Sequence, residues 1–277
     1  MSDHSRAESG TLPARITIHD LAAAKERGER WPMLTAYDAT TAAILDDAGV
    51  PVLLVGDSAA TVIYGYDTTI PVTVDELLPL VRGVVRGSRR ALVVADLPFG
   101  SYQTSPAQAI ETGARFLKDG HAHAVKLEGG ASVLPQVQAM TSAGIPVMGH
   151  LGLTPQSVHQ LGGYRVQGRG EAGDRLLEDA LQLQEAGAFA LVLEVVPSEL
   201  AARVTRALRI PVIGIGAGNA TDAQVLVIQD LVGLTRGHVA KFVQPYASLG
   251  VAMREAVERW ASDVAAGTYP SPAHSYE

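Results

Sequence analysis

The chain has 277 residues, of which 47% are hydrophobic and 18% are charged, and it contains no cysteine. This composition excludes disulfides, thiolate metal sites and cysteine nucleophiles, and it is too apolar for a disordered chain. The net charge of −7 argues against nucleic acid and anionic membranes as partners, because both attract basic surfaces. The opening segment lacks the apolar core of a signal peptide, and no apolar run is long enough for a membrane helix, so we expect a cytoplasmic protein.

A repeated unit organises the chain. A stretch with helical spacing is followed by glycine or proline and then by a short apolar, often β-branched run. The predicted strands, in chain order, are PMLTAYD (32–38), VPVLLVGDS (50–58), ALVVADLP (91–98), HAVKLEGG (123–130), IPVMGHLG (145–152), FALVLEVV (189–196), IPVIGIGAG (210–218) and AQVLVIQD (223–230). The predicted helices between them include residues 39–49, 74–87, 105–120, 131–144 and 175–187.

This alternation indicates a parallel sheet that is covered by helices. About eight such units favour a closed (β/α)8 barrel over an open doubly wound sheet. We expect one catalytic barrel domain over residues 15–268, a flexible N-terminal arm over 1–14 and a C-terminal tail over 269–277. Residues 153–174 are the longest connection without clear periodicity, which is typical of lids and binding loops. A final amphipathic helix is predicted from Tyr246 to about Ala265.

Ionisable residues end strand after strand. In a parallel barrel all strand C-termini open on one face, where barrel enzymes place their catalytic groups. So many carboxylates would repel one another unless a cation neutralised them, and a hard divalent metal with oxygen ligands is the simplest cation for that role. The strand-end residues are Asp38, Asp57, Asp96, Glu128, His150 and Glu194.

Several of these residues have a plainer interpretation. An Asp after a strand often caps the next helix, and we favour this interpretation for Asp38. Lys126 could extend its ammonium group to solvent, and Glu194 could pair with an arginine. His150, taken alone, is more typical of a hydrogen-bonded core histidine. The segment GIGAGN resembles a dinucleotide-binding fingerprint, but its glycine spacing is wrong and no acidic residue ends a following strand.

Several motifs together resemble the ketopantoate hydroxymethyltransferase family. They are LTAYD, LLVGDS, YGYDTTIPVTVDEL, VVADLPFGSY, VKLEGG, GHLGLTPQSVHQLGGYRVQGRG, LVLEVVP, PVIGIGAGN and AHSYE, in order over about residues 15–277. The resemblance implies a (β/α)8 barrel that binds Mg²⁺ and assembles into a homo-oligomer, typically a homodecamer. It also implies transfer of a one-carbon unit from 5,10-methylenetetrahydrofolate to 3-methyl-2-oxobutanoate, which gives 2-dehydropantoate and tetrahydrofolate in pantothenate synthesis.

The resemblance also implies roles for individual residues. The proton acceptor falls on Glu194 in LVLEVVP, where it would remove the C3 proton of the keto acid. One small departure is Ala39, which follows TAYD where family members often carry an aromatic residue. The residues that place the folate stay unassigned. The metal positions fall on Asp57, Asp96 and Glu128, and the keto acid contacts fall on Asp57, Ser58, Asp96 and Lys126.

Lys126 and Glu128 lie two residues apart on one predicted strand, so their side chains must point to the same side. Alone, they could be a salt bridge at a strand end. Beside Asp57 and Asp96, Glu128 is expected to reach the metal, directly or through a water, and Lys126 the anionic substrate. Lys126 could instead form the imine of a Schiff-base aldolase, but such an enzyme has no need of three carboxylates.

Two other functions stay open at this point. One is another Mg²⁺-dependent aldolase or lyase of 2-oxo acids on the same type of barrel. The other is a noncatalytic barrel that binds a keto acid. A decayed site would be expected to lose at least one of its reactive residues, which argues against the second alternative. The residues retained are Asp57, Asp96, Lys126, Glu128 and Glu194.

Overall fold

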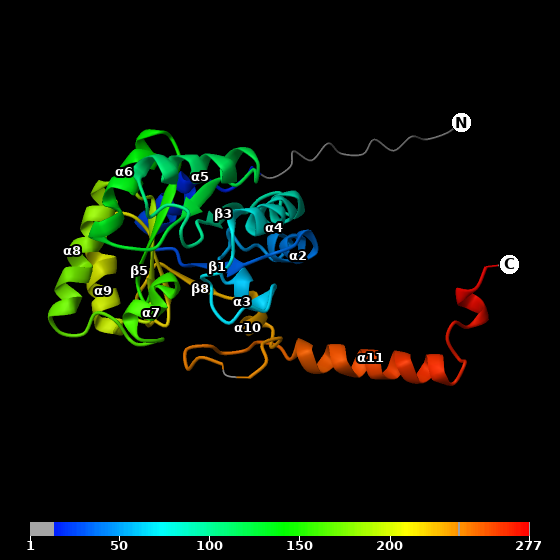
Figure 1. Cartoon of the computed structure of the whole chain (residues 1–277). Helices are drawn as coiled ribbons and strands as arrows, with labels where there is room; N and C mark the ends of the chain where they lie inside the picture. The colour runs from blue at the N-terminus through cyan, green and yellow to red at the C-terminus, as the bar shows by residue number, and fades with distance from the viewer. Residues whose placement is uncertain (1–13, 238, 277) are drawn as a thin grey trace, which may run out of the picture. The chain divides into compact units, whose positions relative to one another are not determined.

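The structure is a computed structural model that describes residues 14–237 and 239–276 (Figure 1). The chain falls into two compact units, one up to Val225 and one from Leu226 onward. The predicted N-terminal arm, residues 1–14, lies outside the described residues except for Ala14. The limits predicted from the sequence for the catalytic domain, residues 15–268, stay a prediction.

A closed barrel of parallel strands forms the first unit. Over the described part of the chain, eight strands follow one another around the barrel in sequence order, which confirms the predicted (β/α)8 fold. The last predicted strand, 223–230, is wrong in its second half, because the N–H groups of Asp230 and Leu231 donate to Val227 O and close a helical turn. The strands are β1 (Trp31–Thr35), β2 (Val52–Val55), β3 (Leu92–Asp96), β4 (Ala124–Lys126), β5 (Val147–Gly152), β6 (Ala190–Glu194), β7 (Val212–Ile215) and β8 (Ala223–Leu226).

Helices alternate with the strands and cover the outside of the barrel (Figure 1). Neighbouring helices pack in pairs, α2 against α4 and α5 against α6. The helices of the first unit are α1 (Ile18–Glu26), α2 (Ala39–Asp47), α3 (Ala59–Val62), α4 (Val74–Gly87), α5 (Pro106–Lys118), η1 (Ala131–Val133), α6 (Leu134–Ser142), η2 (Pro155–Ser157), α7 (Val158–Leu161), α8 (Glu171–Glu185) and α9 (Ser198–Ala207). The second unit contains α10 (Ile228–Leu231), α11 (Leu249–Ala265) and η3 (Pro272–His274).

Two sequence expectations about helices can be compared with these bounds. The predicted final helix is present as α11, although it begins at Leu249 rather than at Tyr246. The connection over residues 153–174 is more regular than expected, because it contains η2 and α7 and the first turn of α8. No helix in the described part of the chain combines the length and apolarity that a membrane span needs.

The alternation of side-chain direction along the strands places polar residues inside one end of the barrel. Alternate strand residues, among them Val94, Met148 and Val192, form one buried cluster. Because side chains alternate along a strand, the residue two places further on points in the same direction. Two places after these core residues, near the C-terminal ends of four strands, the inward-pointing residues are polar. They are Asp96, Lys126, His150 and Glu194.

His123, just before β4, gives the fold a testable pH dependence. Its Nδ1 accepts the backbone N–H of Val93 at 2.9 Å. Burial and the nearby charge of Arg15 lower the pKa of His123 to about 4. The ordinary pKa of histidine is about 6.5. Below that pH, His123 is protonated in the unfolded chain but stays neutral in the folded chain until the pH approaches about 4. The stability that neutral His123 contributes is therefore present above pH ~6.5 and is lost as the pH falls toward about 4.

We expect the variant His123→Gln to show a shallower loss of stability over this pH range than the wild type. Glutamine does not titrate, and its side-chain oxygen can still accept the N–H of Val93. Denaturant unfolding at a series of pH values and one protein concentration measures the two slopes. Equal slopes for the two proteins would contradict the neutral state assigned to His123.

Candidate active site

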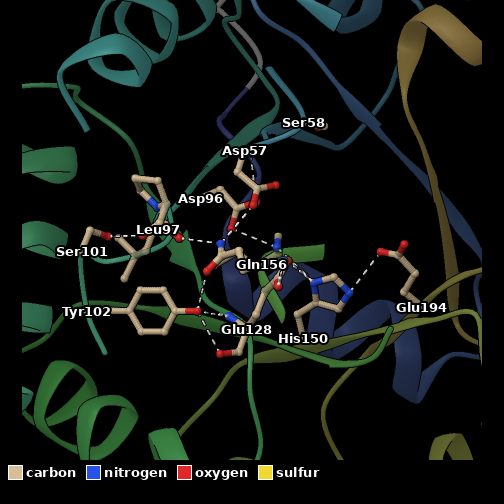
Figure 2. A network of polar contacts seen from close by, with 12 residues as sticks. Asp57, Ser58, Asp96, Leu97, Ser101, Tyr102, Glu128, His150, Gln156 and Glu194 are labelled. Carbon is tan, nitrogen blue, oxygen red and sulfur yellow. Dashed lines mark hydrogen bonds and ion pairs between the residues drawn. The ribbon is translucent and has the colours of Figure 1, made fainter. Parts of the chain in front are cut away.

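The predicted site residues lie at or just after the C-terminal ends of β2, β3, β4 and β6, and Figure 2 labels all of them except Lys126. Asp96 and Lys126 are register partners on β3 and β4, and Asp96 Oδ1 lies 2.9 Å from Lys126 Nζ. Asp96 Oδ2 accepts the backbone N–H of Asp57 at 3.2 Å. All three side chains are buried, so the centre of the site is two neighbouring carboxylates and one ammonium group.

His150 lies between two further carboxylates of the site (Figure 2). Its Nδ1 is 3.3 Å from Glu128 Oε1, and its Nε2 is 3.2 Å from Glu194 Oε2. Lys126 Nζ is 3.2 Å from the same Nδ1. His150 is buried, as a core histidine would be, but that interpretation is incomplete, because the imidazole contacts the predicted base and a predicted metal ligand. Glu194 lies beside this imidazole.

Asp57 and Ser58 reach the site from a turn rather than from a strand. β2 ends at Val55, and the chain turns at Gly56, where an added Cβ would lie 2.7 Å from Ser58 Oγ. A side chain at this position would therefore displace the Ser58 hydroxyl. Ser58 Oγ and the hydroxyl of the buried Tyr37 are 2.8 Å apart, which fixes the serine hydroxyl at the site.

The end of β6 holds Glu194 in place through an unusual backbone. Val195 has φ of 48°, a left-handed conformation that is strained for a β-branched residue. Its N–H donates to Ile215 O at 2.8 Å, and its carbonyl accepts the N–H of Gln167 at 3.0 Å. An added Cβ on Gly152 would collide with the carbonyl of Glu194. The close approach of β5 to β6 therefore depends on a glycine beside the predicted base.

Burial and mutual repulsion raise the energy of the charged carboxylates. Burial, followed by the charges of Asp96 and Glu128, raises the pKa of Asp57 well above its ordinary value. Burial also raises the pKa of Asp96, although the charge of Lys126 opposes this effect. The ammonium of Lys126 is itself buried, yet the three surrounding carboxylates raise its pKa. A cation bound beside Asp57 and Asp96 would relieve this excess of negative charge.

Glu128 and His150 favour each other's charged form. Burial opposes ionisation of Glu128, but contact with His150, the charge of Lys126 and the N–H of Gln156 give a net lowering of its pKa. Burial and Lys126 oppose the charge on His150, whereas Glu128 and Glu194 raise its pKa to about 9. The imidazole is therefore protonated at neutral pH in this arrangement.

The donor set of the site fits Mg²⁺. Among the described residues, no three His, Cys, Asp or Glu side chains already converge as a finished metal cluster. Asp96 faces Lys126, and Glu128 faces His150. Mg²⁺ is commonly held by one or two carboxylates while waters and substrate oxygens complete its coordination. Asp57 and Asp96 are adjacent buried oxygen donors with raised pKa values, and they satisfy that requirement.

Sequence reasoning missed two residues of the site, Tyr102 and Gln156. Both are buried, and the Tyr102 hydroxyl donates to Gln156 Oε1 at 2.8 Å. The only sequence signal was that both lie inside motifs quoted above, VVADLPFGSY and GHLGLTPQS. In the GIGAGN segment, packing explains Gly218, since an added Cβ there would lie 2.6 Å from Ser198 Cβ.

Comparisons with known proteins agree over nearly the whole chain. A family described as ketopantoate hydroxymethyltransferase matches residues 15–272. A protein of Frankia alni named 3-methyl-2-oxobutanoate hydroxymethyltransferase is 65% identical over 95% of this chain and 87% of its own length. A protein of Thermobifida fusca with the same name is 61% identical, and the match covers 100% of both chains.

Solved structures with the same fold are much more distant in sequence. A phosphonopyruvate hydrolase in complex with oxalate and Mg²⁺ has a TM-score of 0.60 at 12% identity, over 94% of this chain and 91% of that one. A 2,3-dimethylmalate lyase of the PEP mutase/isocitrate lyase superfamily has a TM-score of 0.57 at 19% identity, over 89% and 88% of the two chains. At these identities the comparison supports the barrel architecture alone.

Proposed function

The chain belongs to the ketopantoate hydroxymethyltransferase family, and from this premise we propose how its residues carry out the transfer. The chain is an enzyme of pantothenate biosynthesis that hydroxymethylates 3-methyl-2-oxobutanoate. The proposal is that 5,10-methylenetetrahydrofolate donates the one-carbon unit, that one Mg²⁺ per subunit assists, and that 2-dehydropantoate and tetrahydrofolate are the products. A cytoplasmic location and a homodecamer belong to the same proposal, and the homodecamer rests on family resemblance.

The neighbouring carboxylates of Asp57 and Asp96 carry this proposal. They are buried, their pKa values are raised, and Asp96 Oδ2 lies 3.2 Å from the backbone N of Asp57. When bound there, Mg²⁺ supplies a hard positive charge that polarises a keto oxygen and stabilises the negative charge that develops on it. Glu128 would support the same ion, directly or through a water.

Lys126 and Ser58 are proposed to bind the keto acid itself. The ammonium of Lys126 is charged and lies next to Asp96, so it can contact the anionic substrate beside the metal carboxylates. The hydroxyl of Ser58 is held by Tyr37 and can donate to the substrate carboxylate. A raised pKa also keeps Lys126 protonated, which argues against a Schiff-base mechanism, because an imine requires the neutral amine.

Glu194 is proposed to remove the C3 proton of the keto acid. It ends β6, on the far side of His150 from Glu128, so it can act without serving as a metal ligand. Its side chain is 16% exposed, more than those of the other site acids, and a substrate can reach it. Water adds to the methylene carbon of the folate and both of its C–N bonds break, which releases tetrahydrofolate and leaves the one-carbon unit at the oxidation level of formaldehyde. The C3 carbanion forms the new C–C bond to this carbon, and the resulting alkoxide takes up the proton that Glu194 removed.

A reconstituted reaction tests this assignment. We expect 2-dehydropantoate, identified by mass spectrometry, when the protein is incubated with 3-methyl-2-oxobutanoate, 5,10-methylenetetrahydrofolate and Mg²⁺. Formation should stop when EDTA removes the metal and resume when excess Mg²⁺ is added back. Undiminished product in EDTA would contradict the role of the metal, and undiminished product without the folate would contradict the donor.

A further inference from the structure

Gln156 lies in η2, directly after β5, and its side chain is buried within the site (Figure 2). Its backbone N–H donates to Glu128 Oε2 at 3.0 Å. Its side-chain nitrogen donates to Asp57 Oδ2 at 3.0 Å and to the carbonyl of Leu97 at 3.0 Å. One residue thus contacts two of the three proposed metal carboxylates, although it lies 99 positions from Asp57 and 28 from Glu128.

The orientation of the Gln156 amide follows from its partners. The carbonyl of Leu97 can only accept a hydrogen bond, so the NH₂ group must face it, and the same nitrogen then lies against Asp57 Oδ2. On the opposite side, Gln156 Oε1 accepts the hydroxyl of Tyr102 at 2.8 Å. The Tyr102 oxygen lies 3.2 Å from the backbone N of Glu128 and accepts that N–H. A flipped amide would place its oxygen against the carbonyl of Leu97, so Tyr102 and Leu97 together fix one orientation.

Gln156 orients the carboxylates without neutralising them. A hydrogen bond from a neutral amide occupies one oxygen of Asp57, and the backbone N–H occupies one oxygen of Glu128. The full negative charge of each group remains, whereas an arginine or lysine at this place would compete with a bound cation. Ligating carboxylates are commonly oriented by such outer hydrogen bonds, and loss of one partner costs about 10–100-fold in metal affinity.

We propose that Gln156 is a positioning residue that aims Asp57 and Glu128 at the cation, with Tyr102 holding its amide in the active orientation. The inference rests on the proposed function of the same site. It adds a residue that is neither a metal ligand nor a contact of the keto acid. Its effect should therefore appear first in the affinity for Mg²⁺.

The variant Gln156→Met tests the side-chain part of this role, because methionine has a similar length and donates no hydrogen bond. We expect the dissociation constant for Mg²⁺, measured by calorimetry without substrate, to rise by about 10–100-fold. The rate at saturating Mg²⁺ should recover to within a few fold of wild type, since neither the base nor the ligands are removed. If Gln156 only stabilised the fold, the variant would have a lower melting temperature. It would not combine a weakened affinity for Mg²⁺ with a nearly normal rate at saturating Mg²⁺.

The matched control is Gln136→Met, which replaces another buried glutamine. The side-chain nitrogen of Gln136 donates to the carbonyl of Gln103 at 3.4 Å rather than to a site carboxylate, and the side chain of Gln103 in turn donates to Gln156 Oε1 at 3.3 Å. The affinity of the Gln136→Met variant for Mg²⁺ should equal that of the wild type. The inference would be overturned if Gln156→Met bound Mg²⁺ as tightly as the wild type. It would also be overturned if Gln156→Met and Gln136→Met lost affinity for Mg²⁺ by the same factor.

If Gln156→Met does not fold, Tyr102→Phe tests the same chain of hydrogen bonds. Removal of the hydroxyl takes away a donor to Gln156 Oε1 and the acceptor of the Glu128 N–H, while the contacts of the Gln156 nitrogen remain, so the Mg²⁺ affinity should fall by a smaller factor. An unchanged affinity in that variant would overturn the inference. Failure of the proposed function is distinguishable, because the wild-type protein itself would then not bind Mg²⁺ in the same calorimetric experiment.

Discussion

Glu194→Gln should abolish most of the exchange of the C3 hydrogen of 3-methyl-2-oxobutanoate with solvent. Loss of a positioned general base commonly slows proton transfer by about 10²–10⁴-fold. Glutamine has nearly the same shape as glutamate, and its side-chain oxygen can still accept a hydrogen bond from His150 Nε2, which lies 3.2 Å from Glu194 Oε2. The fold and the Mg²⁺ site should therefore survive. NMR of the keto acid in heavy water measures the exchange rate, and calorimetry measures Mg²⁺ binding.

Glu199→Gln is the matched control for this experiment. Glu199 lies in the first turn of α9, close behind β6 in sequence, but its side chain is exposed. The same change of charge there should leave the exchange rate within a few fold of wild type. Wild-type exchange in Glu194→Gln would mean that another group removes the proton. A joint loss of exchange and Mg²⁺ binding would mean that Glu194 supports the metal instead.

Asp57→Asn should raise the dissociation constant for Mg²⁺ by more than about 10–100-fold, which is the usual cost of losing a group that only hydrogen-bonds to a metal ligand. Asparagine keeps the size of the side chain, and its carbonyl can still accept the Gln156 amide that now donates to Asp57 Oδ2 at 3.0 Å. The charge that attracts the cation is lost. Removal of a carboxylate also lessens the repulsion within the site, so the apoprotein should be no less stable than the wild type.

Asp38→Asn provides a stringent control for that change. Asp38 follows β1 much as Asp57 follows β2, but it caps α2 and accepts the N–H of Thr41 at 2.8 Å. Asparagine is an equally good N-cap, so both stability and Mg²⁺ affinity should be unchanged. Calorimetric titration of both variants with Mg²⁺ gives the comparison. Equal affinities in Asp57→Asn and wild type would remove Asp57 from the metal ligands.

The two aspartates also show what the sequence could predict. Helical spacing after Asp38 favoured a cap, and the structure confirms it. Strand parity together with the shared level of the strand C-termini brought Asp96, Lys126 and Glu194 into one barrel mouth, which the structure also confirms. Both inferences needed only local periodicity and the geometry of a parallel barrel.

The contacts that the sequence could not predict depend on long-range packing. Gln156 lies in a connection without clear periodicity, and its partner Asp57 is 99 positions away. The role of His150 was missed for a similar reason, because a lone histidine on a strand gives no sign of Glu128 and Glu194 on either side of it. The predicted strand over residues 223–230 was too long because the whole segment is apolar enough for a strand. Its second half is a helical turn, which is formed by backbone hydrogen bonds to the carbonyl of Val227.

Deuterium exchange at C3 by the wild-type enzyme provides the sharpest test of proton abstraction by Glu194. The protein, 3-methyl-2-oxobutanoate and Mg²⁺ are incubated in heavy water with and without tetrahydrofolate, and loss of the C3 proton signal is followed by NMR. We predict exchange that requires Mg²⁺ and stops in EDTA, because Glu194 removes the proton and the cation that Asp57 and Asp96 would hold would stabilise the negative charge left on the keto acid. Absence of exchange in Mg²⁺, with or without tetrahydrofolate, would contradict the proposed mechanism.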